Sequence, residues 1–422
     1  MALLSSAFIY LNFFGISYPF LNTLLGVLSL YVLLKEEEKT WFYFGAFLGL
    51  FWFWWIVVSF KHYEMLWAIP IGLVMIALIY GVIFWSIAKI ASLTTRWIYP
   101  PNYSTLKVDK STLLSLCIKG LGLLLLSYLH PFGFDWLKLE LMFVESYIGI
   151  EKWQFLVVLL ALILTLAKRN NTYLILILLA YQPIDIISPY TSSTKEKIEL
   201  ISTHTTVQNK WNTALQPAQF ELLFAQIDQA IEENKTLVIL PESVFPLFLN
   251  HSQTLIDKLQ KRAKKIDIVT GGLYWDGKVP HNSTYIFRQN KISVAHKVIL
   301  VPFGESNPLP NFLSDWVNRV FYDGAIDYQA SANITDYKVG EVHYRNAICF
   351  EATSEALYAK SKKGNYPKNM IVLSNNGWFT PSTEPTLQKL LLMYYSKKYG
   401  TTIYHAVNMS ESYIIEGGKV RD

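Results

Sequence analysis

Cysteine is scarce in this chain of 422 residues, which has only Cys117 and Cys349. Two distant thiols exclude a disulfide framework, and the eight histidines are too dispersed for a zinc site. A Gly-rich phosphate loop, an internal repeat and a stripe of arginines interleaved with aromatic residues are also absent, so the net charge of +5 does not indicate a nucleic-acid partner. We therefore expect no metal, no other cofactor and no nucleic acid.

Charged residues are rare in residues 1–190, where apolar runs alternate with short charged loops. Each run is close to the ~20 residues that a helix needs to cross a bilayer. The runs predict a membrane domain of about seven helices, at residues 3–17, 18–34, 41–60, 65–92, 112–129, 153–167 and 172–189. A signal peptide is disfavoured because Met1–Phe20 has no basic start and no small-residue cleavage site.

Lysine and arginine concentrate in alternate loops of this region. Lys35 and Lys39 form the first group, residues 89–110 contain the second, and Lys168 and Arg169 form the third. The positive-inside rule places these loops in the cytoplasm, so an odd number of spans puts the rest of the chain outside. In a bacterial cell this predicts an inner-membrane protein whose second half lies in the periplasm.

Gly45 and Gly49 are four residues apart within one apolar run. This small-xxx-small spacing lets two helices approach each other closely. We expect the two glycines to pack one span against another.

Residues from about 195 onward mix polar, charged and apolar residues as a water-soluble fold does, after a turn-rich segment at 189–197. The predicted domains are therefore 1–190 and 195–422. Strands are expected at 198–208, 236–240, 267–271, 283–288, 292–298, 343–349, 369–373 and 401–407. Helices are expected at 217–233, 253–265, 352–363 and 384–399. This alternation indicates a layered α/β fold.

Three reactive side chains, Glu242, Lys297 and Cys349, each follow a run of β-prone residues. The three groups can therefore lie together at the ends of neighbouring strands. A thiol attacks a carbonyl only as thiolate, so Glu242 suits the role of base and Lys297 that of charge stabiliser. His296 adjoins Lys297 but faces the other side of a strand, which disfavours a Cys-His protease.

Each of these residues also has a simpler interpretation when taken alone. A lone buried cysteine such as Cys349 is often a small core residue, and Glu242 after a proline can cap a helix. Glu305 can belong to an ordinary turn, and Glu351 can be a helix-start carboxylate that the helix dipole favours. The occurrence of the whole set in one order favours a catalytic site.

The order of these motifs resembles the nitrilase superfamily. The matching residues are Leu240-Pro241-Glu242, Asn282-Ser283 and Ile348-Cys349-Phe350-Glu351. The segment from Lys297 to Glu305, with a membrane half in front of it, is similar to one branch in particular, the apolipoprotein N-acyltransferases. Further similarities to this branch are Lys210-Trp211, the loop at 130–134 and the segment from Ser374 to Phe379.

The resemblance implies an α-β-β-α sandwich behind the membrane helices and a role for each matched residue. Glu242 would be the general base, Lys297 the positive charge beside the intermediate, and Cys349 the nucleophile. Glu305 and Glu351 would orient Lys297 or the pocket. Trp378 and Phe379 match an aromatic pair of the acyl or lipid site.

The resemblance also implies a reaction. An acyl chain would move from a phospholipid, usually phosphatidylethanolamine, to the cysteine as a thioester, releasing lysophospholipid. The chain would then pass to the α-amine of the diacylglyceryl-cysteine at the N-terminus of an apolipoprotein.

Two parts of the sequence depart from the branch. The branch usually carries a further transmembrane helix after the hydrolase-like domain, and the sequence up to Asp422 has no apolar run there. Lys389 and the leucines after it replace the branch's basic and small residues, although Gln388 is present. How the acceptor is held therefore does not follow from the resemblance.

Two alternative functions stay open from the sequence. The first is a membrane-tethered amidase or nitrilase that uses water as acceptor. The second is a tether without catalysis that only binds lipoproteins, which the intact Glu242, Lys297 and Cys349 disfavour.

Overall fold

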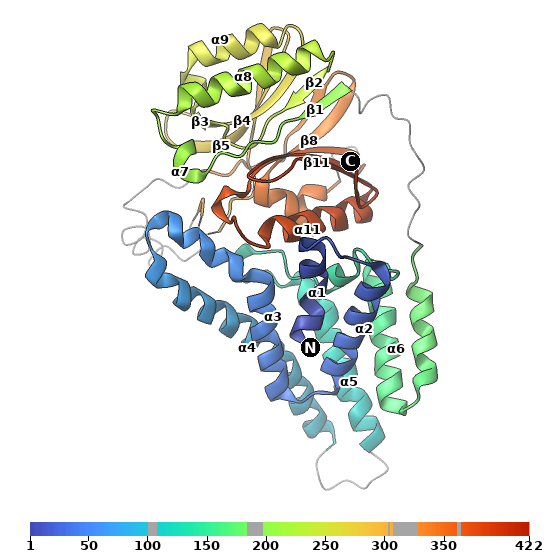
Figure 1. The fold of residues 1–422 in the computed structure, drawn as a ribbon. Coiled ribbons are helices and arrows are strands. Elements are labelled where there is room, and N and C mark those ends of the chain that lie inside the picture. Colours follow the sequence, from blue (N-terminus) through green and yellow to red (C-terminus); the bar gives the residue numbers. More distant parts are fainter. Residues whose placement is uncertain (100–107, 184–196, 303, 307–327, 361–363, 422) are drawn as a thin grey trace. The chain divides into compact units, whose positions relative to one another are not determined.

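The computed structural model describes residues 1–99, 108–183, 197–302, 304–306, 328–360 and 364–421 (Figure 1). The chain forms two compact units. A helical unit contains Met1–His130, Asp135–Ile186 and Pro381–Leu390, and a sandwich unit contains Pro131–Phe134, Ile187–Thr380 and Leu391–Asp422. The predicted domain boundary between residues 190 and 195 lies outside the described residues and stays a prediction.

Helices occupy all seven predicted apolar runs within the described residues. They are α1 (Ala2–Phe13), α2 (Pro19–Lys35), α3 (Glu38–Phe53) with η1 (Trp54–Tyr63), η2 (Leu66–Ala68) with α4 (Ile69–Ile98), α5 (Val108–Leu125) with η4 (Leu126–Tyr128), α6 (Lys152–Lys168) and η7 (Asn171–Ala180). Three segments, Glu38–Tyr63, Leu66–Ile98 and Lys110–Tyr128, are long and apolar enough to cross a bilayer. These segments indicate an integral membrane protein. The count of seven spans stays a prediction.

Close packing of α3 on α4 depends on two glycines. A Cβ atom added at Gly45 would lie 2.4 Å from the carbonyl oxygen of Tyr80, and one at Gly49 would lie 2.6 Å from the Tyr80 ring. Both distances are too short for any larger residue, so the small side chains allow the backbones to approach. This confirms that the two glycines pack one helix of the membrane part against another.

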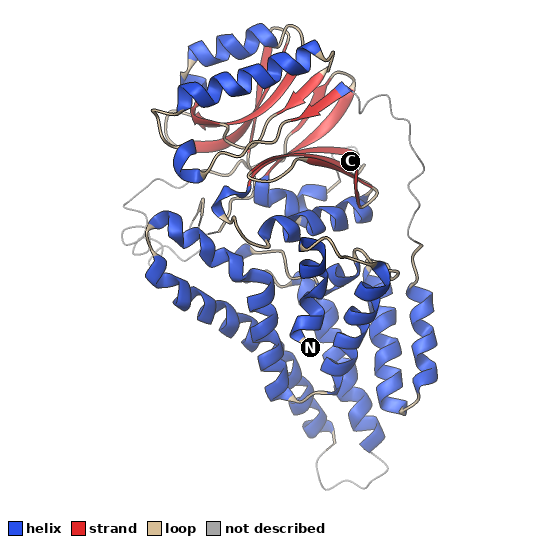
Figure 2. Cartoon of the chain, in the orientation of Figure 1, coloured by secondary structure: helices blue, strands red, loops and turns tan. Residues whose placement is uncertain are grey.

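The described strands all belong to the sandwich unit (Figure 2) and form two sheets of six. The first sheet has the order β1-β2-β4-β5-β6, with β3 beside β4. Its strands are β1 (Ile198–Leu200), β2 (Leu237–Ile239), β3 (Phe245–Phe248), β4 (Asp267–Trp275), β5 (Pro280–Arg288) and β6 (Lys291–His296). Pairing is parallel among β1 to β4 and antiparallel from β4 to β6.

The second sheet has the order β12-β11-β10-β9-β8-β7. Its strands are β7 (Asp336–Val339), β8 (Val342–Ile348), β9 (Asn369–Asn375), β10 (Thr402–Asn408), β11 (Tyr413–Glu416) and β12 (Lys419–Arg421). The central pairs β8–β9 and β9–β10 are parallel, so the carboxyl ends of these three strands lie at one edge of the sheet.

Apolar side chains hold the layers of the sandwich unit together. Helices α8 (Gln216–Glu232) and α9 (Gln253–Arg262) cover the outer face of the first sheet through buried residues that include Phe224, Ile227, Leu259, Val238 and Phe287. The two sheets share a second core that includes Ile239, Val269, Ile286, Tyr344, Ile371 and Tyr404.

Successive residues of a strand point to opposite faces, so a run of apolar residues such as that of β2 is buried on both sides. The residues from Leu391 onward in α11 (Glu384–Tyr399) cover the outer face of the second sheet (Figure 1), where Ser396 Oγ accepts the Gly418 N–H at 3.2 Å. The expected α-β-β-α sandwich is confirmed.

Two predicted elements are wrong. The strand expected at 198–208 ends at Leu200, because the Asn408 side chain accepts the Thr205 N–H at 3.0 Å and the Thr206 side chain begins the short helix α7 (Val207–Lys210). The helix expected at 352–363 is replaced by two short 3-10 helices, η10 (Cys349–Thr353) and η11 (Glu355–Tyr358), and residues 361–363 lie outside the described ones.

Strands β3, β7, β11 and β12 were not predicted from the sequence. Three of them are strands of only three or four residues in the second sheet, where β7 and β12 are the edge strands and β11 is next to β12. Such short segments pair with a neighbour that is already in place, so their own composition indicates little.

Candidate active site

Glu242 follows β2 in a tight turn that presses against β4. Ser243 has a φ of 47°, and a Cβ atom at Gly271 would lie 2.4 Å from the Ser243 nitrogen and 2.7 Å from the Glu242 Cα. Only glycine therefore leaves room on β4 for this turn. The turn holds the Glu242 carboxylate in a fixed place, and the residue is 8% exposed.

Lys297 comes directly after β6, opposite Asn282 of β5. The Lys297 N–H donates to the Asn282 carbonyl at 2.9 Å, and the preceding pair in register is Ser283 with His296. Strand alternation puts Lys297 and Asn282 on one face and His296 on the other. His296 Nδ1 lies 2.8 Å from Ser283 Oγ, so His296 faces away from Lys297 as the sequence predicts.

A compact network joins the ammonium of Lys297 to two carboxylates. Lys297 Nζ lies 2.7 Å from Glu305 Oε2 and 3.9 Å from Glu242 Oε1. Asn282 Nδ2 donates to Glu242 Oε1 at 2.7 Å and to Glu305 Oε1 at 2.8 Å. Glu305 Oε2 also accepts the Val301 N–H at 2.9 Å. Glu305 therefore fixes the position of the ammonium, and Asn282 fixes the position of both carboxylates.

Cys349 follows β8 and begins η10 with a φ of 53°, a left-handed conformation that is uncommon for a residue other than glycine. Two residues later, Glu351 Oε1 accepts the Ile348 N–H at 2.8 Å. The other oxygen, Oε2, accepts the Val298 and Ile299 N–H groups at 2.7 and 3.0 Å. One buried carboxylate thus ties the backbone before Cys349 to the backbone after Lys297. The ends of the two sheets meet at this point.

Burial and charge shift the pKa values of these groups in opposite directions. Burial raises the pKa of Glu242. The ammonium of Lys297 opposes this shift, and the carboxylate of Glu305 adds to it. Burial alone would lower the pKa of Lys297, but Glu305 and Glu242 together raise it. Burial also raises the pKa of Glu351 to about 7, although Lys297 and the three N–H donors oppose this. Lys297 therefore stays a cation at neutral pH, while Glu242 becomes a stronger proton acceptor.

Aromatic residues lie at the same edge of the second sheet as Cys349. Ile348 pairs with Leu373 in the parallel strands β8 and β9, and Trp378 and Phe379 follow the end of β9, where both are half-buried. The Phe134 ring, from a loop of the first half of the chain, lies 5.2 Å from the Phe350 ring between centroids. Aromatic side chains therefore lie at the edge of the sheet at which the Cys349 segment begins.

Several residues of the site were not given a role from the sequence. Asn282 was noted only as part of a motif, Gly271 was not noted, and Lys210 was noted only beside Trp211. Lys210 Nζ donates to the Glu242 carbonyl oxygen at 3.0 Å and is 2% exposed. A glycine pair that begins at the last residue of a predicted strand signals a close backbone approach and could have pointed to Gly271.

No disulfide joins Cys117 and Cys349. Cys117 is exposed on the surface of α5. Cys349 is buried.

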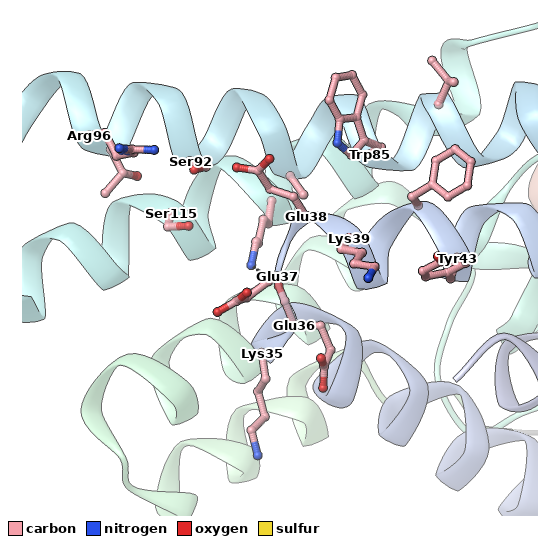
Figure 3. Close-up of a pocket in the computed structure, with 15 residues that line it drawn as sticks. Lys35, Glu36, Glu37, Glu38, Lys39, Tyr43, Trp85, Ser92, Arg96 and Ser115 are labelled. Atoms are coloured by element: carbon pink, nitrogen blue, oxygen red, sulfur yellow. Dashed lines mark hydrogen bonds between the residues drawn. The ribbon is translucent and has the colours of Figure 1, made fainter.

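The helical unit has a pocket of its own, about 810 Å³ in volume, where α2 ends and α3 begins (Figure 3). Its wall carries charges of both signs, among them Lys35, Glu37, Glu38 and Arg96, together with the aromatic rings of Tyr43 and Trp85. Lys119, from α5, donates to the Glu36 carbonyl at 2.7 Å and thereby satisfies the C-terminal end of α2. None of the predicted site residues lines this pocket.

Comparison with known proteins gives consistent matches. Residues 1–185 match the family described as "Apolipoprotein N-acyltransferase integral membrane domain". The apolipoprotein N-acyltransferase of Wolinella succinogenes is 41% identical, over 98% of this chain and 94% of that protein. The one of Helicobacter pylori is 33% identical, over 95% and 89%. A CN-hydrolase superfamily protein of Xanthomonas campestris, XC1258, is similar at 13% identity over 53% of this chain and 84% of that chain, with a TM-score of 0.40.

Proposed function

Because the chain belongs to the apolipoprotein N-acyltransferase family, we propose that acyl transfer in this enzyme runs through Cys349, with Glu242 as base and Lys297 as charge stabiliser. Glu305 and Glu351 support them by orienting Lys297 and the two strand ends. Trp378 and Phe379 contribute to the site for the acyl chain. The enzyme is an integral membrane acyltransferase, and both of its substrates are anchored in lipid.

In the first half-reaction, Glu242 takes the proton of the Cys349 thiol. The thiolate attacks the ester carbonyl of a phospholipid, and the charge that develops on the carbonyl oxygen is stabilised by Lys297. The intermediate collapses when the C–O bond to glycerol breaks and Glu242 returns the proton to the leaving oxygen. The products are lysophospholipid and an acyl thioester on Cys349.

In the second half-reaction, the α-amine of a diacylglyceryl-cysteine attacks the thioester carbonyl. A C–N bond forms, the C–S bond breaks, and the amine proton passes through Glu242 back to the thiolate. Free Cys349 is restored, and the lipoprotein gains an amide-linked chain. Because one carboxyl group both accepts and returns protons in each half-reaction, a raised Glu242 pKa suits both tasks.

The observation that carries this proposal is the Glu351 carboxylate, which accepts N–H groups from both Ile348 and Val298. It joins the segment of the nucleophile to the segment of the stabilising ammonium across two separate sheets. Simple packing of a core cysteine needs no such link. The arrangement therefore supports a site in which the relative position of Cys349 and Lys297 matters.

We further propose phosphatidylethanolamine as the main acyl donor. We also propose the bacterial inner membrane as the location, with the catalytic domain in the periplasm. The donor is proposed from the resemblance of the motifs. The orientation is supported by the Lys and Arg residues that gather in alternate loops, since short basic loops stay on the cytoplasmic side.

Analysis of the lipid products tests the function. Purified enzyme with phosphatidylethanolamine and a diacylglyceryl-peptide should yield lysophospholipid and N-acylated peptide in equal amounts, and Cys349→Ala should yield neither. Release of free fatty acid or ammonia without acylated peptide would instead support the amidase alternative. An exposed control, Lys258→Met, should behave as the wild type.

A further inference from the structure

A second buried lysine contacts the general base without belonging to the Glu-Lys-Cys set. Lys210 ends α7, 32 residues before Glu242, and its Nζ donates to the Glu242 carbonyl oxygen at 3.0 Å. The side chain is almost fully buried, at 2% exposed. A lysine this deeply buried is costly unless its charge meets a partner. Its position therefore requires an explanation beyond packing.

The hydrogen bond from Lys210 acts on a strained piece of backbone. The carbonyl that it binds belongs to the peptide between Glu242 and Ser243, and Ser243 has a φ of 47°. The turn also presses on Gly271 from the other side. Lys210 and Gly271 together fix the backbone position from which the Glu242 side chain extends.

The charges around Cys349 give Lys210 a second task. Glu242 after β2 and Glu305 after β6 are two carboxylates, and Lys297 supplies one ammonium against them. The further groups are Glu351 and the thiol itself, both in η10. With Lys297 alone the pocket would carry an excess negative charge, and a new thiolate would form beside that excess. The ammonium of Lys210 reduces this excess.

We propose that Lys210 is a positioning residue for the acyl transfer. It fixes the backbone of Glu242 and lowers the negative charge of the pocket, so that Cys349 can become a thiolate. This inference rests on the proposed function of Glu242 and Cys349. It adds a second cation to the site that Glu242, Lys297 and Cys349 form.

The titration of Lys210 agrees with this role. Burial lowers the pKa of Lys210 to about 8, while Glu242 and Cys349 oppose that shift. Lys210 is therefore still mostly charged at neutral pH. Its positive charge would act on both Glu242 and Cys349. An ion pair with a formed thiolate would hold the proton on Lys210 more firmly.

The test compares Lys210→Met and Lys210→Arg in a Cys117→Ser background, so that Cys349 is the one thiol. The first readout is the alkylation rate of Cys349 by iodoacetamide as a function of pH, which needs no lipid. The second is the rate of thioester formation with phosphatidylethanolamine at pH 7. The matched control is Lys258→Met, which removes an exposed lysine of α9. Thermal unfolding of each variant checks that it folds.

Lys210→Met should move the alkylation midpoint upward by about one pH unit, as loss of a nearby opposite charge does. Its thioester formation at pH 7 should fall about tenfold. Lys210→Arg keeps the charge and should keep the midpoint. If the Met variant does not fold, Lys210→Gln, which retains a donor but no charge, takes its place with the same expected shift.

An unchanged midpoint in the uncharged variant would overturn the inference, even if the rate fell, because a purely structural lysine would give that result. Failure of the proposed function is a separate outcome. It would appear as a wild-type enzyme that forms no thioester on Cys349, whatever the alkylation midpoints are.

Discussion

At the scale of single residues, Glu242 is the group whose chemistry can be tested most simply. Glu242→Gln keeps the size of the side chain and an acceptor for Asn282, but the amide cannot take up a proton. Loss of a general base typically costs about 10²–10⁴-fold in rate. The rate of thioester formation, followed by mass spectrometry, should fall within that range. Glu221→Gln, at an exposed position on α8, is the matched control. A rate of thioester formation in Glu242→Gln within about threefold of this control would show that Glu242 is not the general base.

A second glutamate, Glu384, should affect stability through pH. Glu384 begins α11, is 2% exposed, and its Oε2 has no hydrogen-bond partner among the described residues. Burial raises its pKa to about 8 from an ordinary value of 4.5. Below pH 4.5 the carboxyl is protonated in both folded and unfolded chains, so it has no effect on stability. Between pH 4.5 and 8 only the unfolded chain releases the proton, so the free energy of unfolding falls as pH rises.

The expected slope from Glu384 is about 1.4 kcal/mol per pH unit over this window. Glu384→Gln should remove that contribution, so the melting temperature of the variant in detergent should exceed that of the wild type by more at pH 8 than at pH 5. An equal difference at both pH values would show that Glu384 does not titrate there.

The predicted reactive residues share one property that made them visible in the sequence. Glu242, Lys297 and Cys349 each follow an apolar strand, so their neighbours along the chain already indicate their place. Lys210 and Asn282 act on Glu242 from 32 and 40 residues away. Contacts of that kind depend on strand order and on packing, which a single sequence does not specify.

At the scale of elements, the turn after β2 depends on the neighbouring strand. Gly271→Ala would place a Cβ atom 2.4 Å from the Ser243 nitrogen, so one of the two backbones would have to shift. Gly272→Ala, one residue further on β4, is the matched control, because its Cβ would meet Leu249 and Tyr285 at an ordinary 3.4 Å.

We expect Gly271→Ala to lower the free energy of unfolding by about 1–3 kcal/mol, the usual cost of overpacking, and to slow thioester formation. The control should change both much less. Thermal unfolding and single-turnover acylation would measure the two effects. Equal behaviour of the two alanine variants would mean that the turn does not need Gly271.

Elements were predicted well where pattern and length agreed, and poorly around the site. Helices α8 and α9 lie close to their predicted ranges, because their apolar faces follow the helical period. The helix expected after Cys349 is absent at 352–363 within the described residues. The Glu351 carboxylate accepts three N–H groups, and Cys349 has a left-handed conformation. The contacts of the site therefore determine the backbone conformation there, and helical propensity does not.

At the scale of the whole molecule, the orientation in the membrane can be tested with introduced thiols. In a background of Cys117→Ser and Cys349→Ala, we expect Lys258→Cys on α9 to react with a membrane-impermeant maleimide in intact spheroplasts. Lys39→Cys, in the first turn of α3 at the end that the basic residues place inside, should react only after lysis. Both positions are exposed. The reverse pattern of labelling would put the sandwich unit in the cytoplasm.

The division into an apolar helical part and a water-soluble part was apparent from composition, since apolar and mixed segments separate so clearly, whereas the α-β-β-α sandwich was expected from the resemblance of the motifs. The proposed reaction depends on one covalent step at Cys349. The most direct test is mass spectrometry of the intact protein and of its peptides after incubation with phosphatidylethanolamine. We predict one acyl chain per molecule, attached to Cys349, released by hydroxylamine and absent from Cys349→Ala. An acyl chain on another residue, or an unmodified Cys349 while the acceptor is still acylated, would contradict the account.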